Sequence, residues 1–131
     1  MRAYVPITPA ELQDFLNDGE FEVTEALIVE PGALAAADLD ETEQEELEFE
    51  RSWGAALVSR QRQGSDQALG FVLAAELCKE HVGKIEGDQV ALLSKLEWAQ
   101  VQSLLVAESE ETELSWFAPQ EIASYLSKWL A

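Results

Sequence analysis

The chain has 131 residues, of which 47% are hydrophobic, and it carries a formal net charge of −18 from 26 acidic and 8 basic residues. The hydrophobic share argues against intrinsic disorder, and the length predicts a single globular domain over residues 1–131. The negative charge argues against direct binding to nucleic acid or to an anionic membrane surface, because contacts with phosphates need clustered Lys and Arg.

Cysteine usage and the lack of long apolar runs predict a cytoplasmic protein. A single cysteine forbids an internal disulfide and suits a reducing compartment. The first residues contain no apolar segment of the kind found in secretory signals, and no apolar run approaches the roughly 20 residues that span a bilayer.

The N-terminal part of the chain predicts a strand, a helix and a second strand. Residues 2–7 alternate loosely, and Pro6 lacks an amide donor, so the first strand should have an edge or an end at that point. Thr8 and Glu11 form a capping box that starts a helix with proline in its first turn. The apolar block within residues 21–30 indicates a buried strand. If the two strands are parallel, they form a right-handed βαβ unit with the helix.

Residues 39–63 predict a long helix along which charge is sorted. Carboxylates crowd its first half, and arginines lie toward its second half, an order that opposes the helix macrodipole. Gly64 follows at the position of a left-handed C-cap. Apolar residues at helical spacing predict a face that packs on the sheet. This face consists of Phe49, Trp53, Ala56 and Leu57, with Leu47 and Val58 at its margins.

The second half of the chain predicts further strands and a last helix. Residues 67–77 have a fully apolar centre and indicate a central strand. Over residues 89–108 we favour two strands around a helical turn at 97–100, and one continuous helix is the alternative. Pro119 opens a final helix. Its apolar face consists of Ile122, Leu126, Trp129 and Leu130.

The interleaving of these strands and helices predicts an α+β fold. We expect two layers, with a four- or five-stranded mixed sheet and about three helices, the longest near residues 40–63. The sequence has neither internal repeats nor a low-complexity linker that would divide this fold.

The sequence contains no catalytic constellation and no cofactor motif that we would assign. Cys78 and His81 bring a thiol near an imidazole, but a structural zinc site needs four ligands and a nucleophile–base pair needs an orienting third group. We interpret them as a small buried cysteine and a surface histidine. Glycine-rich phosphate loops and hydrolase motifs are missing. We therefore predict no catalytic residue, no cofactor and no metal ligand.

The carboxylates of the long helix are the best functional clue. Glu41, Glu45 and Glu48 lie along one helical face. They predict a protein-interaction or regulatory module whose acidic face binds a basic patch on a partner protein.

Two alternatives of other classes remain. One is a hydrolase-like enzyme with a carboxylate acid/base pair in a cleft, which we favour less because no catalytic motif supports it. The other is a homo-oligomeric structural protein, for instance a homodimer, with Trp116, Phe117 and Trp129 at the subunit contact.

Short segments spread over most of the chain carry a family resemblance. They are residues 1–8 (MRAYVPIT), 45–49 (EELEF), 72–77 (VLAAEL), 98–101 (WAQV) and 105–108 (LVAE). On these segments the chain resembles an uncharacterised actinobacterial family of small acidic proteins, a domain of unknown function. The resemblance implies a bacterial cytoplasmic protein and a strand at residues 101–107, and it carries over no catalytic residue. The chain departs from the family pattern between Pro31 and Thr42, and residues 116–131 have no clear counterpart.

Overall fold

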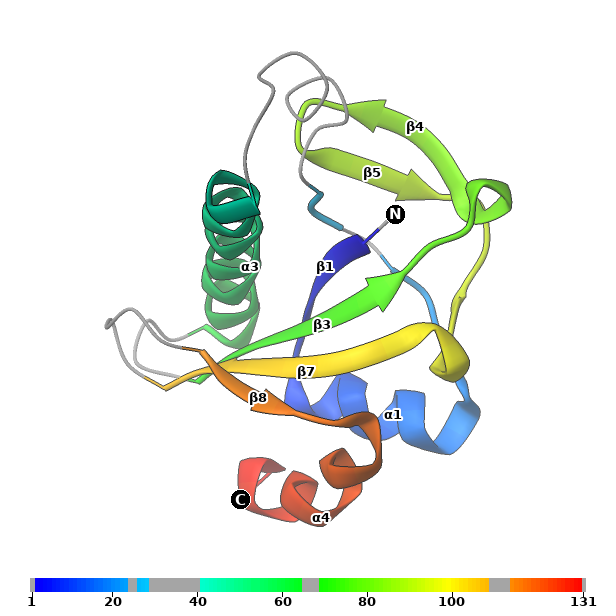
Figure 1. Ribbon diagram of the computed structural model, residues 1–131. Helices are drawn as coiled ribbons and strands as arrows, with labels where there is room; N and C mark the ends of the chain where they lie inside the picture. The colour runs from blue at the N-terminus through cyan, green and yellow to red at the C-terminus, as the bar shows by residue number, and fades with distance from the viewer. Residues whose placement is uncertain (1, 24–25, 29–40, 65–68, 109–113, 131) are drawn as a thin grey trace.

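The structure is a computed structural model that describes residues 2–23, 26–28, 41–64, 69–108 and 114–130 (Figure 1). The ends of three expected elements, residues 29–30, 39–40 and 67–68, lie outside the described residues. The helices are α1 (Pro9–Asp18), α3 (Glu41–Gln63) and α4 (Pro119–Leu130). Two short 3-10 helices, η1 (Lys79–His81) and η2 (Trp98–Gln100), connect strands.

Four strands form the main sheet, in the order β1-β3-β7-β8. These strands are β1 (Arg2–Ile7), β3 (Gly70–Glu76), β7 (Val101–Ala107) and β8 (Ser115–Phe117). The remaining strands pair two by two. Strand β2 (Glu20–Phe21) pairs with β6 (Leu96–Glu97), and β4 (Val82–Glu86) pairs with β5 (Gln89–Leu92).

Residues 26–28 join the main sheet to the β4–β5 hairpin. The amide of Tyr4 donates to the carbonyl oxygen of Leu27 at 2.8 Å, and the amide of Leu27 donates to the carbonyl oxygen of Tyr4 at 2.9 Å. On the other side of this segment, the amide of Val90 donates to the carbonyl oxygen of Ala26 at 3.1 Å. The bridge between Tyr4 and Leu27 is antiparallel, so the parallel βαβ unit that the sequence suggested does not form.

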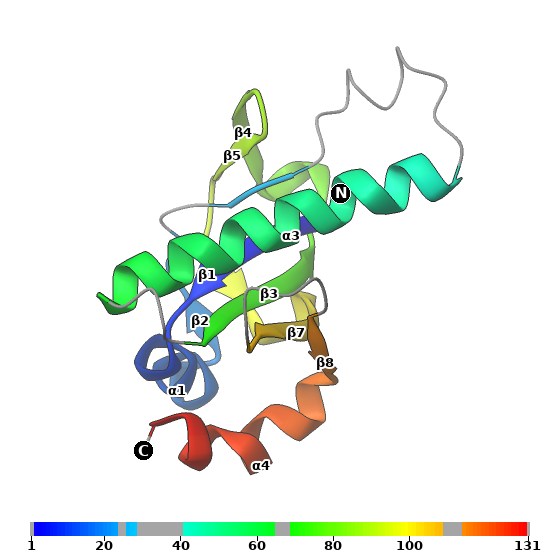
Figure 2. The ribbon, with the colours of Figure 1, turned by 90° about the vertical axis from the view of Figure 1, so that its left-hand side faces the viewer.

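Helices cover both faces of the main sheet. Figure 2 shows α3 across one face and α1 and α4 against the other. The α+β class, the main sheet of four strands and the long helix are confirmed. The arrangement has a helical layer on each side of the sheet rather than the expected single one, and every strand pair among the described residues is antiparallel rather than mixed. Six consecutive residues of β3, Gly70 to Ala75, are buried, so both faces of this central strand are covered, which explains the extra layer.

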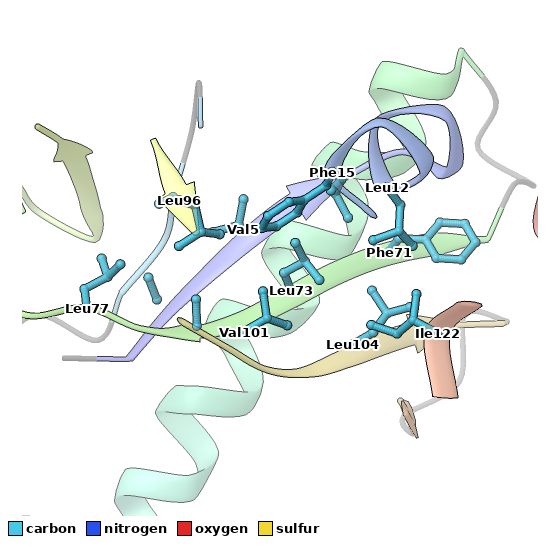
Figure 3. Packing of buried hydrophobic residues seen from close by; sticks show 14 of the residues in the cluster. Val5, Leu12, Phe15, Phe71, Leu73, Leu77, Leu96, Val101, Leu104 and Ile122 are labelled. Carbon is cyan, nitrogen blue, oxygen red and sulfur yellow. The ribbon is translucent and has the colours of Figure 1, made fainter. Parts of the chain in front are cut away.

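The larger core lies between the sheet and the helices α1 and α4. Leu12 and Phe15 of α1 and Ile122 of α4 pack on Phe71 and Leu104 of the sheet (Figure 3). The Thr8 capping box that fixes the start of α1 is present, and Gly19 ends the helix in the left-handed region with φ of 76°. Burial of these large side chains makes this face the main hydrophobic contribution to stability.

Small side chains mediate the contact between α3 and the opposite face of the sheet. The buried residues of α3 are Ser52, Ala55, Ala56, Ser59 and Arg60. The face predicted from the apolar pattern is wrong for Phe49 and Leu57, which are 40% and 43% exposed. The helix approaches the sheet too closely for large side chains: a Cβ added to Gly70 of β3 would lie 2.6 Å from the carbonyl oxygen of Ala56.

The second half of the chain agrees with the favoured interpretation of strands around a helical turn. Strands β5, β6 and β7 occupy the region for which one continuous helix was the alternative, so that alternative is wrong. Strand β8 was not expected. It pairs antiparallel with β7 through Trp116 and its two neighbours.

Ser59 ties α3 to both β1 and β3. Its hydroxyl donates to the carbonyl oxygen of Ile7 at 2.7 Å and accepts from the amide of Phe71 at 3.0 Å. Ser59→Ala leaves both buried backbone groups without this partner, so we expect the free energy of unfolding to fall by about 1–3 kcal/mol. Urea denaturation measures the change. Ser127→Ala on the exposed side of α4 is the control and should leave the free energy of unfolding unchanged.

Two glycines provide a matched test of how closely α3 lies on the sheet. Gly70→Ala should destabilise the fold by roughly 1–3 kcal/mol, because the new methyl group meets backbone atoms of Ala56. Gly54→Ala should instead stabilise it by up to about 1 kcal/mol, because alanine favours the helix and its methyl group meets Leu27 at an ordinary 3.6 Å. Thermal and urea unfolding of the two variants measure both effects. Equal changes in stability for the two variants would contradict the close approach of α3 to β3.

Candidate functional site

A pocket of about 370 Å³ opens between the first half of α3 and the sheet. It lies where α3 passes over the start of β1, the end of β3 and the start of β7. Its polar lining side chains come from three different elements. They are Arg2 and Tyr4 of β1, Glu48 and Ser52 of α3, and Gln102 and Ser103 of β7.

A β-bulge in β7 brings two consecutive polar residues into this pocket. Ala74 of β3 pairs with Ser103, but Ala75 pairs with Val101, so Gln102 is an extra residue on β7. Val101 and Leu104 belong to the core beneath α1 and α4. Gln102 and Ser103, which lie between them, both line the pocket on the α3 side. The bulge therefore breaks the usual alternation and places two polar side chains on one face.

The Tyr4 side chain is the most deeply placed acid–base group of the pocket, with 5% of its surface exposed. Burial raises the pKa of its phenol, and the negative charge of Glu48 raises that pKa further. The nearby charge of Arg2 and a hydrogen bond from the Arg2 side chain lower it, but the net direction is upward. The phenol is therefore neutral over the physiological range, and its oxygen accepts from Arg2 while its proton is available for donation.

Ser103 is buried, and its hydroxyl has no protein partner in the part of the chain that the structure describes. The residue is 6% exposed and lines the pocket next to the bulge. The hydroxyl is not a buried unsatisfied group, because it opens to the pocket, where solvent can hydrogen-bond to it. An unpartnered hydroxyl at a pocket marks a position where a bound molecule can supply the partner.

Apolar side chains complete the pocket. Ala74 and Leu105 line it from the sheet, and Phe49 lines it from α3. Trp116 of β8 also lines it and is 61% exposed. A pocket that combines a few polar groups with exposed aromatic surface has the make-up typical of ligand sites.

The structure places the three predicted site residues along one side of α3. Glu41 and Glu45 are exposed, whereas Glu48 is half-buried and lines the pocket. At spacings of four and three residues they continue the stripe that reaches the sheet at Ser52. The acidic stripe and the packed face of α3 are thus one continuous side of the helix.

The other residues considered from the sequence lie elsewhere. Cys78 is exposed rather than buried, because it follows Leu77, the residue that turns into the core. The ring nitrogen Nδ1 of His81 lies 3.2 Å from the amide nitrogen of Gln100. Within the described residues no cluster of three or more His, Cys, Asp or Glu is arranged to hold a metal ion.

Two of the three aromatic residues expected at a subunit contact pack within the chain. The ring of Phe117 lies 5.2 Å from that of Trp129 and 4.9 Å from that of Tyr125. Trp129 also contacts Phe71 in the core, at 5.3 Å between ring centroids. Trp116 remains exposed beside the pocket.

Of the polar residues that line the pocket, only Glu48 was predicted from the sequence as a site residue. Arg2 and Tyr4 share a face of the first strand because they are two residues apart, but a strand pattern alone does not show what lies above that face. Gln102 and Ser103 did carry a signal. Two adjacent polar residues between Val101 and Leu104 break the alternation of a strand, which indicates a bulge.

The fold and the pocket define an α+β domain in which an acidic helix crosses an antiparallel sheet. The chain belongs to DUF6912, a family of unknown function, whose profile matches residues 1–113. The resemblance to a family of unknown function is therefore confirmed. No curated protein and no solved structure matches the chain. Among the helices of the described ranges, none is both long enough and apolar enough to cross a membrane.

The raised pKa of Tyr4 gives a test of the pocket geometry. Tyr4 should ionise above the ordinary tyrosine pKa of about 10. Because the folded state holds this proton more tightly than the unfolded state, the stability that it contributes is present below pH of about 10 and is lost as pH rises through the folded pKa. Tyr4→Phe should remove the late absorbance change near 295 nm and flatten the alkaline loss of stability. The Tyr125→Phe variant is the control and should keep both.

Proposed function

We propose that the protein is an interaction module that binds a basic segment of a partner protein through the first half of α3. Six carboxylate residues lie on α3 before its first basic residue, Arg51. The stripe residues Glu41, Glu45 and Glu48 share one side of the helix and are accessible to solvent, fully or in part. Carboxylates arranged in this way attract Lys and Arg side chains and accelerate their association.

The observation that carries the proposal is an aromatic pair beside the stripe. The rings of Phe49 and Trp53 stack with 6.3 Å between their centroids, and Phe49 is 40% exposed. Aromatic residues are enriched at protein interfaces, so a stacked aromatic pair beside the carboxylates favours a contact surface. The faces of such rings bind guanidinium and ammonium groups, so the aromatic pair and the stripe favour the same kind of partner.

The second half of α3 supplies a rigid base for this surface. Arg51 donates from Nε to the carbonyl oxygen of Ile28 at 3.1 Å, and its Nε lies 3.7 Å from a carboxylate oxygen of Asp88. Arg60 is buried, donates to the carbonyl oxygen of Ala107 at 3.3 Å and lies over the ring of Trp53. Arg51 and Arg60 therefore face the fold, whereas the stripe residues Glu41, Glu45 and Glu48 are accessible to solvent, fully or in part.

We also propose that the protein is located in the cytoplasm of an actinobacterial cell. This location is supported by the single cysteine and by the family resemblance of the sequence.

Replacing Glu41, Glu45 and Glu48 together by glutamine tests the proposal. We expect this stripe variant to lose at least about tenfold in affinity for a basic partner captured by the wild-type chain, and the wild-type complex to weaken steeply with salt. Binding measured by calorimetry or surface plasmon resonance gives both quantities. The matched control replaces Glu20, Glu22 and Glu80 by glutamine; these residues are exposed and lie outside α3, and the change in net charge is equal. Unchanged affinity of the stripe variant, or an equal loss in the control, would refute the role of the stripe.

A further inference from the structure

Several hydrogen-bond donors line the pocket beneath α3. Tyr4 accepts from Arg2, and therefore its proton is free to donate. Ser103 is 6% exposed, and its hydroxyl opens to the pocket, where it can donate to a bound molecule. The Arg2 guanidinium, which also lines the pocket, carries further donors beside Tyr4. These three groups together favour a ligand with an anionic acceptor, such as a carboxylate.

The charged residues of the pocket further restrict the chemistry of the ligand. Glu48 lines the pocket from α3 and supplies a negative charge, whereas Arg2 supplies a positive charge from the sheet. A simple anion entering this pocket is repelled by the net charge of −18, and a simple cation is repelled locally by Arg2. A molecule with one positive and one negative group avoids both costs and can satisfy both side chains.

The remaining surface of the pocket is apolar. Leu105 lines it from β7, and Trp116 lines it from β8. The volume of about 370 Å³ lies at the small end of ligand pockets and suits a compact molecule rather than a nucleotide or a long chain.

We propose that this pocket binds a free α-amino acid with an apolar side chain. The ligand carboxylate accepts from Arg2, Tyr4 and Ser103, the ammonium group donates to Glu48, and the side chain packs against Leu105 and Trp116. The bulge in β7 is what makes this site, because it holds Ser103 and Gln102 together on the pocket side. This site overlaps the proposed partner surface at Glu48 and Phe49.

Calorimetric titration of the full chain with L-phenylalanine and L-leucine tests the proposal. We expect saturable binding of at least one of them, and binding at least about tenfold weaker for phenethylamine and for 3-phenylpropionate, each of which lacks one of the two charged groups. Ser103→Ala should weaken binding of the amino acid by about tenfold or more. Because the hydroxyl has no partner to lose, this variant should keep its thermal stability.

Two further variants distinguish binding in this pocket from binding at another surface of the chain. Ser124→Ala, which changes an exposed serine on α4, should bind the amino acid like the wild type. Glu41→Gln combined with Glu45→Gln should also keep amino-acid binding while it weakens the partner complex, so the two proposals fail independently. The proposal is overturned if neither amino acid binds, if either single-charge analogue binds as tightly as L-phenylalanine, or if folded Ser103→Ala binds like the wild type.

Discussion

The close contact between α3 and the sheet is the constraint on which the rest of the molecule depends. The hydroxyl of Ser59 makes two hydrogen bonds to the backbones of β1 and β3. Ala56 and Gly70 lie so close together that larger side chains would not fit between them. A helix of 23 residues is about 34 Å long, more than the strands beneath it need. Because its second half is fixed, its acidic first half projects across the end of the sheet, and the pocket forms below.

The pairing of single strand residues fixes the positions of the pocket side chains. Tyr4 is held by the backbone hydrogen bonds of β1 on one side and by those to Leu27 on the other, which fixes the position of its phenol. The bulge in β7 faces it across β3, since Tyr4 and Ser103 both pair with Ala74. Tyr4, Ala74 and Ser103, on three neighbouring strands, thus form the floor of the pocket. Helix α3 forms its wall and supplies the negative charge of Glu48, opposite in sign to the charge of Arg2.

Much of the fold was predictable because local chemistry decides it. The capping box at Thr8, the glycine after α3 and the apolar centre of β3 each specify an element with few competing possibilities. The buried side of α3 was not predictable from apolar spacing, because a close helix–sheet contact selects Ser and Ala and leaves Phe49 and Leu57 outside. Glu48 was identified as part of a charged stripe. Its place at a pocket depends on β1 and β7, which are distant in sequence, and periodicity within one helix cannot show that.

The bulge in β7 also determines where this strand can lose a residue. Without Gln102, Val101 would still pair with Ala75 and Ser103 with Ala74, and the strand would alternate regularly. Every core side chain of β7 would keep its face. Position 102 is therefore a point at which the strand tolerates the loss of one residue without rearranging either hydrophobic core, so the shape of the pocket can diverge among relatives while the fold stays the same.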